Sequence, residues 1–333
     1  MKIRNQKVDF YKGLLMWGVI WGHTITALAN NTLNEGIFIH RFFRLYDMPL
    51  FMILSGYFLF KSLEKNISLK DILLDKITRL LIPIIIWNWI IHFPYPSIDS
   101  LYFLWAVFIS SILTIIIHVL TKQSKFKLSL RGVCFLGIIL SLYLLPHWQF
   151  NLFYLYPFFV LGYLSNFIKI KLNFILLFII FITGICLWRP EWSPWKTCPA
   201  NLNGTITPIY FFQFLIGAIG SFIMWKIWSY IFQSNSVINY IAKIGKETMA
   251  LYILQTIAIE ILLSKIVIYI QKEIWDGVNY MTNTQEHINL LGYVIAPIIS
   301  FLSMVILYEI IIYTKKNMYL SKIWGFKITN KQI

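Results

Sequence analysis

Acidic, basic and imidazole side chains share one apolar segment near the start of the chain. It runs from Asp9 and Lys12 to Gly22, His23 and Thr24, and the residues between are nearly all apolar or aromatic. Ionisable side chains are costly in lipid, so those inside a membrane usually serve a function. An imidazole titrates near neutral pH, so His23 is a candidate for proton transfer; a buried packing histidine is the alternative.

Helical spacing would let these side chains face one interior. At about 100° per residue, Asp9 and His23 differ by roughly 40° after whole turns, and Lys12 follows Asp9 by one turn. Their separation along the axis is roughly 21 Å, so Asp9 cannot reach His23. We therefore expect Asp9 and Lys12 to pair at the inner mouth, as part of a binding site or as a structural ion pair, with His23 nearer the outer side.

Apolar spans recur along the whole chain and predict an all-α, polytopic integral membrane protein. Hydrophobic residues make up 58% of the 333 residues and aromatic residues 18%, which does not fit a soluble core. We predict about ten membrane helices around a central cavity, in one domain over residues 1–333. The spans are expected at about 8–29, 45–61, 79–93, 101–120, 132–146, 151–168, 173–189, 207–232, 248–270 and 290–314.

The net charge of +15 is explained by the membrane topology of such a protein and does not indicate a nucleic-acid partner. Lysines and arginines cluster in every second loop and at both ends, which predicts that both termini are cytoplasmic. The exceptions, predicted to lie outside, are Arg41, Arg44, Arg189, Lys196, Lys265 and Lys272. A cleavable signal ending at Ala27-Leu28-Ala29 is the alternative for the N-terminus, but its removal would discard the charged first segment.

Several sequence blocks occur in an order that is typical of one family. They are Asp9-x-x-Lys12-Gly13 with Gly22-His23-Thr24, Met48–Phe58, Lys76-x-x-Arg79 with Pro83, Leu101–Trp105, Tyr156–Tyr163 and Ile244–Gln255. Together they resemble the membrane acyltransferase 3 family, especially its branch related to fucose 4-O-acetylases. Three positions depart from that pattern: Asp47 precedes Met-Pro where histidine is common, Lys76 replaces an arginine, and Gln255 replaces a late histidine.

The resemblance implies acyl transfer from a cytoplasmic thioester, usually acetyl-CoA, to a sugar hydroxyl, with His23 as the general base. It also implies a donor site, to which we assign Asp9, Lys12, Lys76 and Arg79. Lys76 and Arg79 would hold the phosphates of the donor, and charge that merely sets the topology is the alternative.

Residues near the outer end of the second predicted helix are candidates for the acceptor. Arg41 and Arg44 could meet an acidic glycan or Asp47, although a solvated helix end is equally compatible with them. Asp47 and Gln255 replace histidines that are common in the family. They indicate either that the acceptor pocket is altered or that these two positions are not essential to the chemistry. External segments 190–206 and 271–289 carry Trp, Asn, Asp and Glu, which suit sugar contacts or, for the tryptophans, interfacial anchoring.

No metal ligand set is predicted, and no bound cofactor besides acyl-CoA as co-substrate. The expected partners are acyl-CoA, a carbohydrate or glycolipid acceptor and membrane lipids, in a bacterial inner membrane.

A transporter or flippase of lipid-linked glycans is the rival function, because such folds also bury charges around a cavity. The sequence leaves open the acceptor sugar, the acyl chain, the oligomeric state, a Cys186–Cys198 pair and the roles of Glu260 and Glu309. His92, His118 and His147 are expected to be interfacial.

Overall fold

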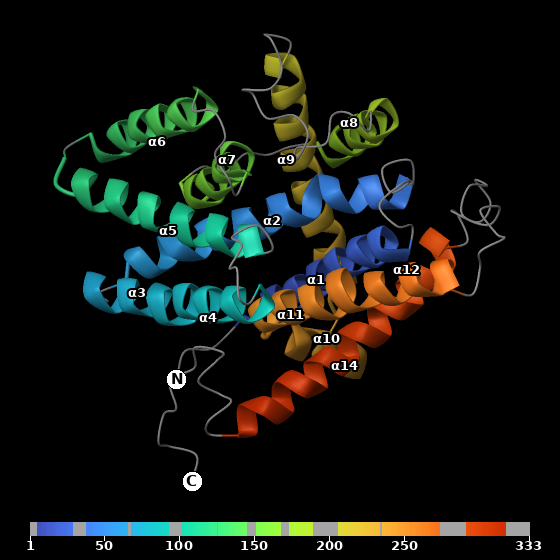
Figure 1. The fold of residues 1–333 in the computed structure, drawn as a ribbon. Helices are drawn as coiled ribbons and strands as arrows, with labels where there is room; N and C mark the ends of the chain where they lie inside the picture. The colour runs from blue at the N-terminus through green and yellow to red at the C-terminus, as the bar shows by residue number, and fades with distance from the viewer. Residues whose placement is uncertain are drawn as a thin grey trace. The chain divides into compact units, whose positions relative to one another are not determined.

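The computed structural model describes residues 5–28, 38–65, 68–92, 101–124, 126–144, 151–167, 173–188, 206–233, 235–273 and 291–317. These residues form helices, and none of them is in a β-strand (Figure 1). The helical class predicted from the apolar spans is therefore confirmed. Both termini and most of the external segments 190–206 and 271–289 lie outside the described residues.

The chain divides into two compact units, and some helices contribute to both. The first unit holds α1 (Gln6–Leu28), residues 38–47 of α2 (Phe38–Leu63), the end of α9 (Ile206–Ile231), α10 (Ser236–Gly245), α11 (Thr248–Gln255), the π-helical η7 (Thr256–Leu263), α12 (Ser264–Glu273), η8 (Leu291–Ile295) and α14 (Ala296–Lys316). The second holds the rest of α2, α3 (Leu69–Lys76), the π-helical η2 (Ile77–Leu81), α4 (Ile82–Ile91), α5 (Tyr102–Thr121), α6 (Lys127–Leu144), α7 (Leu152–Leu164), most of α8 (Phe174–Leu187) and the start of α9. The expectation of one domain over residues 1–333 stays a prediction.

Several of these helices have the length and apolarity of membrane spans. Four described segments qualify by length and composition: Tyr102–Thr121, Pro208–Ile231, Thr248–Val267 and Gly292–Lys316. Shorter apolar helices cover Leu128–Leu142, Leu152–Leu164 and Phe174–Leu187. Many large apolar side chains on these helices are exposed. Such exposure is unfavourable in water and favourable in lipid. The protein is an integral membrane protein, while the ten-helix count and the side of each terminus remain predictions.

Glycines of the family-like blocks mark close helix crossings within each unit. In the first unit, a Cβ on Gly245 of α10 would lie 1.7 Å from the carbonyl oxygen of Asp9, and one on Gly13 would lie 2.4 Å from that of Ile241. In the second unit, a Cβ on Gly56 of α2 would lie 2.0 Å from the Phe159 oxygen. Only residues without a side chain permit such approaches, a common solution in membrane helix packing.

In the second unit, a glycine of α7 makes the matching close approach to α2. A Cβ on Gly162 of α7 would lie 2.0 Å from the carbonyl oxygen of Ile53 on α2. Gly56 and Gly162 therefore seat α2 and α7 against each other. The blocks Met48–Phe58 and Tyr156–Tyr163, distant in sequence, form one packed crossing.

Candidate active site

α1 is the central helix of the first unit and carries the candidate base. It packs against α10, α14, η7 and α11, and in Figure 1 it lies in blue beside the orange and red helices. Asn5 caps its start, because the Asn5 Oδ1 accepts a hydrogen bond from the Lys7 N–H at 3.1 Å. The helix therefore begins close to the predicted residue 8.

Polar side chains fix the rotation of α1 within this unit. The Trp17 indole donates to Oγ of Ser300 at 3.0 Å, and the Trp21 indole donates to the carbonyl oxygen of Gly292 at 2.9 Å. At the other end, the Tyr11 hydroxyl lies 2.6 Å from that of Ser229. These contacts hold opposite ends of α1 against α14, η8 and α9, so His23 sits on a rigid element, as a catalytic side chain requires.

Asp9 and Lys12 lie one helical turn apart near the start of α1. Asp9 is buried, with 3% of its surface exposed, and Lys12 is partly buried. The backbone of Asp9 meets Gly245 at the crossing with α10. The first and last family-like blocks thus meet at the predicted donor residues, which the sequence could not reveal.

His23 is partly buried near the end of α1, and a second histidine lies near the preceding residue, Gly22. A Cβ on Gly22 would lie 3.8 Å from Cδ2 of His40 on α2, and His40 is 1% exposed. Gly18, one turn earlier, likewise faces Phe43, so α1 and this part of α2 run antiparallel. Sequence reasoning missed His40, which belongs to no recognised block.

A helical count could have suggested that histidine. His40, Arg44 and Asp47 follow at i, i+4 and i+7 and share one face of α2. Asp47 is buried, at 6% exposed, and Arg44 is partly buried. An imidazole therefore lies two turns from the position where the family often has one.

The remaining predicted acceptor residues are engaged within the first unit. An Nη1 of Arg41 donates to the carbonyl oxygen of Trp188 at 3.3 Å. Gln255 is fully buried at the end of α11, and its Nε2 donates to Oγ1 of Thr256 at 3.2 Å. The structure thus gathers Asp9, Lys12, His23, Arg41, Arg44, Asp47 and Gln255 in one unit.

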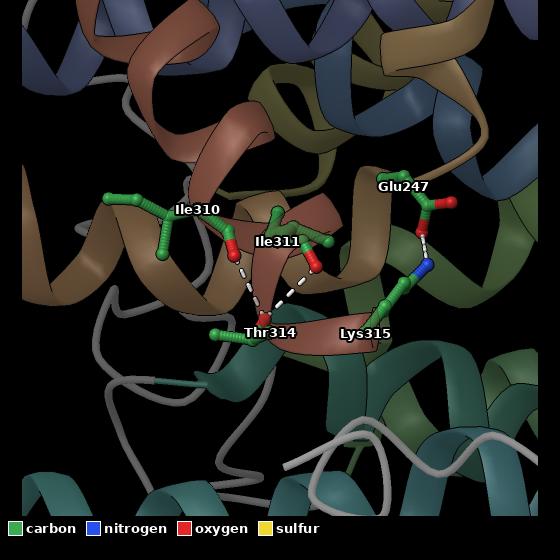
Figure 2. Close-up of polar contacts among 5 residues, drawn as sticks. All are labelled: Glu247, Ile310, Ile311, Thr314 and Lys315. Carbon is green, nitrogen blue, oxygen red and sulfur yellow. Dashed lines mark hydrogen bonds and ion pairs between the residues drawn. The ribbon is translucent and has the colours of Figure 1, made fainter. Parts of the chain in front are cut away.

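An ion pair anchors the link between α10 and α11 that leads to Gln255. Figure 2 shows the Lys315 ammonium of α14 directed at the carboxylate of Glu247, and these side chains are only 18% and 15% exposed. In the preceding residue, Thr314 Oγ1 donates to the carbonyl oxygens of Ile310 and Ile311 at 2.9 and 3.0 Å (Figure 2). A partly buried pair of this kind holds the late block against α14.

Lys76 and Arg79 belong to the second unit, where α3 passes into the π-helical η2. Nε of Arg79 pairs with Oδ1 of Asp75 at 2.6 Å, and the two side chains are 68% and 51% exposed. Ser68 caps α3 by accepting the Asp71 N–H at 3.1 Å. Arg79 thus presents an accessible guanidinium that already has one carboxylate partner.

The residues whose roles the sequence left open are placed in part. Glu309 is exposed on α14 and accepts a hydrogen bond from the Tyr240 hydroxyl at 3.2 Å, while Glu260 lies on η7. Cys186 is exposed on α8, and Cys198 lies outside the described residues. No cluster of three metal-binding side chains occurs among the residues that the structure describes.

Comparison with known proteins connects this geometry with a chemistry. The acyltransferase 3 family, described as an acyltransferase domain, matches residues 5–93, which carry Asp9, Lys12, His23, Lys76 and Arg79. The chain is 24% identical over 294 residues to nodulation protein NolL of Mesorhizobium japonicum, covering 76% of each chain. It is 28% identical over 184 residues to NolL of Sinorhizobium fredii, covering 48% of each. No solved structure matches the chain. The chain is therefore similar to the membrane acyltransferase 3 family, through the family match over residues 5–93 and the two NolL relatives, and this similarity supports an acyltransferase.

Proposed function

We propose that this acyltransferase moves an acetyl group from cytoplasmic acyl-CoA to a sugar hydroxyl of a surface polysaccharide or lipid-linked glycan. The observation that carries the proposal is His23, an imidazole held on the anchored helix α1 inside the segment that matches the family. The similarity to fucose 4-O-acetylases adds the sugar acceptor. The cell location that fits is a bacterial inner membrane.

His23 acts as the general base in this mechanism. Its imidazole takes the proton of the sugar hydroxyl while the hydroxyl oxygen forms a bond to the thioester carbonyl carbon. The carbon–sulfur bond then breaks, the CoA thiolate leaves, and the imidazolium returns its proton to that sulfur. Asp47 and Gln255 stand where the family often has histidine, and neither supplies an imidazole, whereas His23 lies in the block that resembles the family's Gly-His-Thr.

The donor is assigned to the residues near the predicted cytoplasmic face. Arg79 has an exposed guanidinium that can turn from Asp75 to a phosphate, because an exposed ion pair contributes little free energy. Lys76 adds charge one turn earlier. Asp9 and Lys12 organise the inner end of α1, from which the thioester arm extends toward His23.

The acceptor is assigned to the outer part of the first unit. Arg41, Arg44 and Asp47 lie on α2 near the antiparallel contact of Gly22 with His40, close in sequence and space to the end of α1 that carries His23. Gln255 is buried, so its contribution is to shape the interior. Arginine and carboxylate groups suit hydrogen bonding to sugar hydroxyls and acidic glycans.

The experiment that tests the base uses the full-length protein in membranes with isotope-labelled acetyl-CoA. His23→Gln and His23→Ala should lower acyl transfer by about two to four orders of magnitude. Glutamine keeps hydrogen-bonding capacity but cannot accept a proton at working pH. His92→Gln, a change at the end of α4, serves as the matched control and should retain activity. Near wild-type transfer by His23→Gln would refute the base.

A second measurement separates acyl transfer from transport. Mass spectrometry of surface glycans from cells with and without the protein should reveal a missing two-carbon ester. Unchanged acylation together with altered surface delivery of the glycan would favour the transporter alternative.

A further inference from the structure

The second unit contains a buried cationic cluster that uses none of the residues assigned above. Nε of Arg131 on α6 donates to Oγ1 of Thr121 on α5 at 2.9 Å. Nδ1 of His118 on α5 lies 2.7 Å from the hydroxyl oxygen of Tyr163 on α7. Arg131 also acts electrostatically on Tyr163. Exposed fractions are 2% for Arg131, 1% for Thr121, 4% for His118 and 0% for Tyr163, so all four side chains are buried; the interfacial depth expected for His118 stays a prediction.

The packing of α6 turns Arg131 inward. Arg131 and Phe135 follow at i and i+4 and are buried, whereas Val133 and Leu136 are 66% and 61% exposed. Phe135 packs edge-on against Tyr163, with ring centroids 5.4 Å apart. The helices α5, α6 and α7 contact one another (Figure 1). The guanidinium therefore lies among three helices and does not extend into solvent.

Arg131 has no ion-pair partner among the described residues; the carboxylate of Glu64, which acts electrostatically on the same Tyr163, is exposed. A guanidinium offers five N–H donors, and one of them meets a neutral hydroxyl. Within the described part of the chain, no carboxylate lies at ion-pair distance from Arg131 and no other acceptor receives its hydrogen bonds. Arg79, in contrast, has Asp75. An uncompensated buried charge is strongly destabilising, so a protein that retains one gains from an anion that binds there.

We propose that Arg131 binds a phosphate group that enters between the ends of α5 and α6. The planar guanidinium fork matches two phosphate oxygens, and Thr121 holds Nε so that the Nη groups remain for the ligand. Thr121 ends α5, and the following Lys122 and Gln123 are exposed, so the site lies close to the surface. This edge belongs to a predicted cytoplasmic loop.

Two ligands carry such a phosphate: the acyl-CoA donor and a phospholipid headgroup. The helices α3 and η2, which carry Lys76 and Arg79, both contact α5 in the same unit. A donor bound by those residues would lie on the helix that presents Thr121. The donor alternative rests on the proposed function, and the lipid alternative does not.

The test measures phosphate-ligand binding to the purified full-length protein in an uncharged detergent. Affinities for CoA, and for phosphatidylglycerol by native mass spectrometry, are compared among variants. Arg131→Gln should weaken binding of one ligand about ten- to hundredfold, the effect of losing charged hydrogen bonds. Arg131→Lys should recover part of it. Lys122→Gln removes an exposed charge from the same loop as a matched control and should change neither affinity more than about twofold.

The ligand whose affinity falls identifies the source of the phosphate. Loss confined to CoA supports the donor, and loss confined to phosphatidylglycerol supports the lipid. Unchanged affinities for both in a folded Arg131→Gln protein overturn the site. If that variant does not fold, Arg131→Lys decides, because it keeps the charge and lacks the fork; unchanged affinities then overturn the site as well. Wild-type protein that binds phosphate through Arg131 without transferring acetyl groups would refute the proposed function while leaving this site.

Discussion

Gly245→Ala tests whether the first and last family-like blocks meet as the structure places them. The new Cβ would lie 1.7 Å from the carbonyl oxygen of Asp9 and 2.7 Å from the nitrogen of Gly13. Ordinary contact begins near 3.4 Å, so α1 and α10 must separate by about 1.7 Å. Both neighbours are helix backbone and cannot move alone. Overpacking of this kind costs about 1–3 kcal/mol, which should lower the melting temperature by roughly 1–4 °C in a chain of this length.

The assay is heating of the detergent-solubilised protein, followed by size-exclusion chromatography of what remains folded. Gly132→Ala is the matched control, because nothing lies within 4 Å of a Cβ there. Alanine favours a helix over glycine by about 1 kcal/mol, so this control should melt no lower than the wild type. Gly245→Ala should also weaken donor use, because Asp9 is displaced. Equal melting of both variants and the wild type would refute the close crossing.

Three further predictions concern the donor, the topology and the ion pair. Arg79→Ala should weaken acyl-CoA use more than Arg79→Lys, since lysine keeps the charge but not the fork; equal donor dependence at matched membrane levels would remove Arg79 from the site. A reporter fused after Gln332 should be active only in the cytoplasm and one near Asn201 only outside, and reporters on the same side would contradict the ten-span topology. Glu247→Gln or Lys315→Gln should each destabilise the protein by about 1–3 kcal/mol in thermal unfolding, and the double variant by less than the sum; strict additivity would show that the pair is not coupled.

Several helices could be predicted from local properties of the sequence. The first span was expected at about residues 8–29 and is found at Gln6–Leu28, and the last was expected at about 290–314 and is found as η8 with α14. Apolar length and hydrophobicity belong to a continuous segment, so no knowledge of its neighbours is needed. The π-helical form of η2 and η7 was not predicted, because it depends on local strain and packing that apolar length does not encode.

The candidate base was also evident in the sequence, whereas its surroundings were not. His23 stood out because an imidazole in an apolar span is unusual whatever lies beside it. His40 was missed, because its place next to Gly22 depends on how α2 crosses α1. The distance between two helices is set by the side chains at their crossing, which come from separate parts of the chain.

Residue types and their periods by themselves determined an all-helical membrane protein, a candidate base and a set of family-like blocks. Only the tertiary structure decided what the glycines of those blocks do and which charges are buried. Gly245 meets Asp9, Gly162 meets α2, and Arg131, which directly precedes the span expected at about 132–146, turns inward. The physical reason is that burial and close approach depend on the rotation and crossing of helices, and no local pattern specifies either.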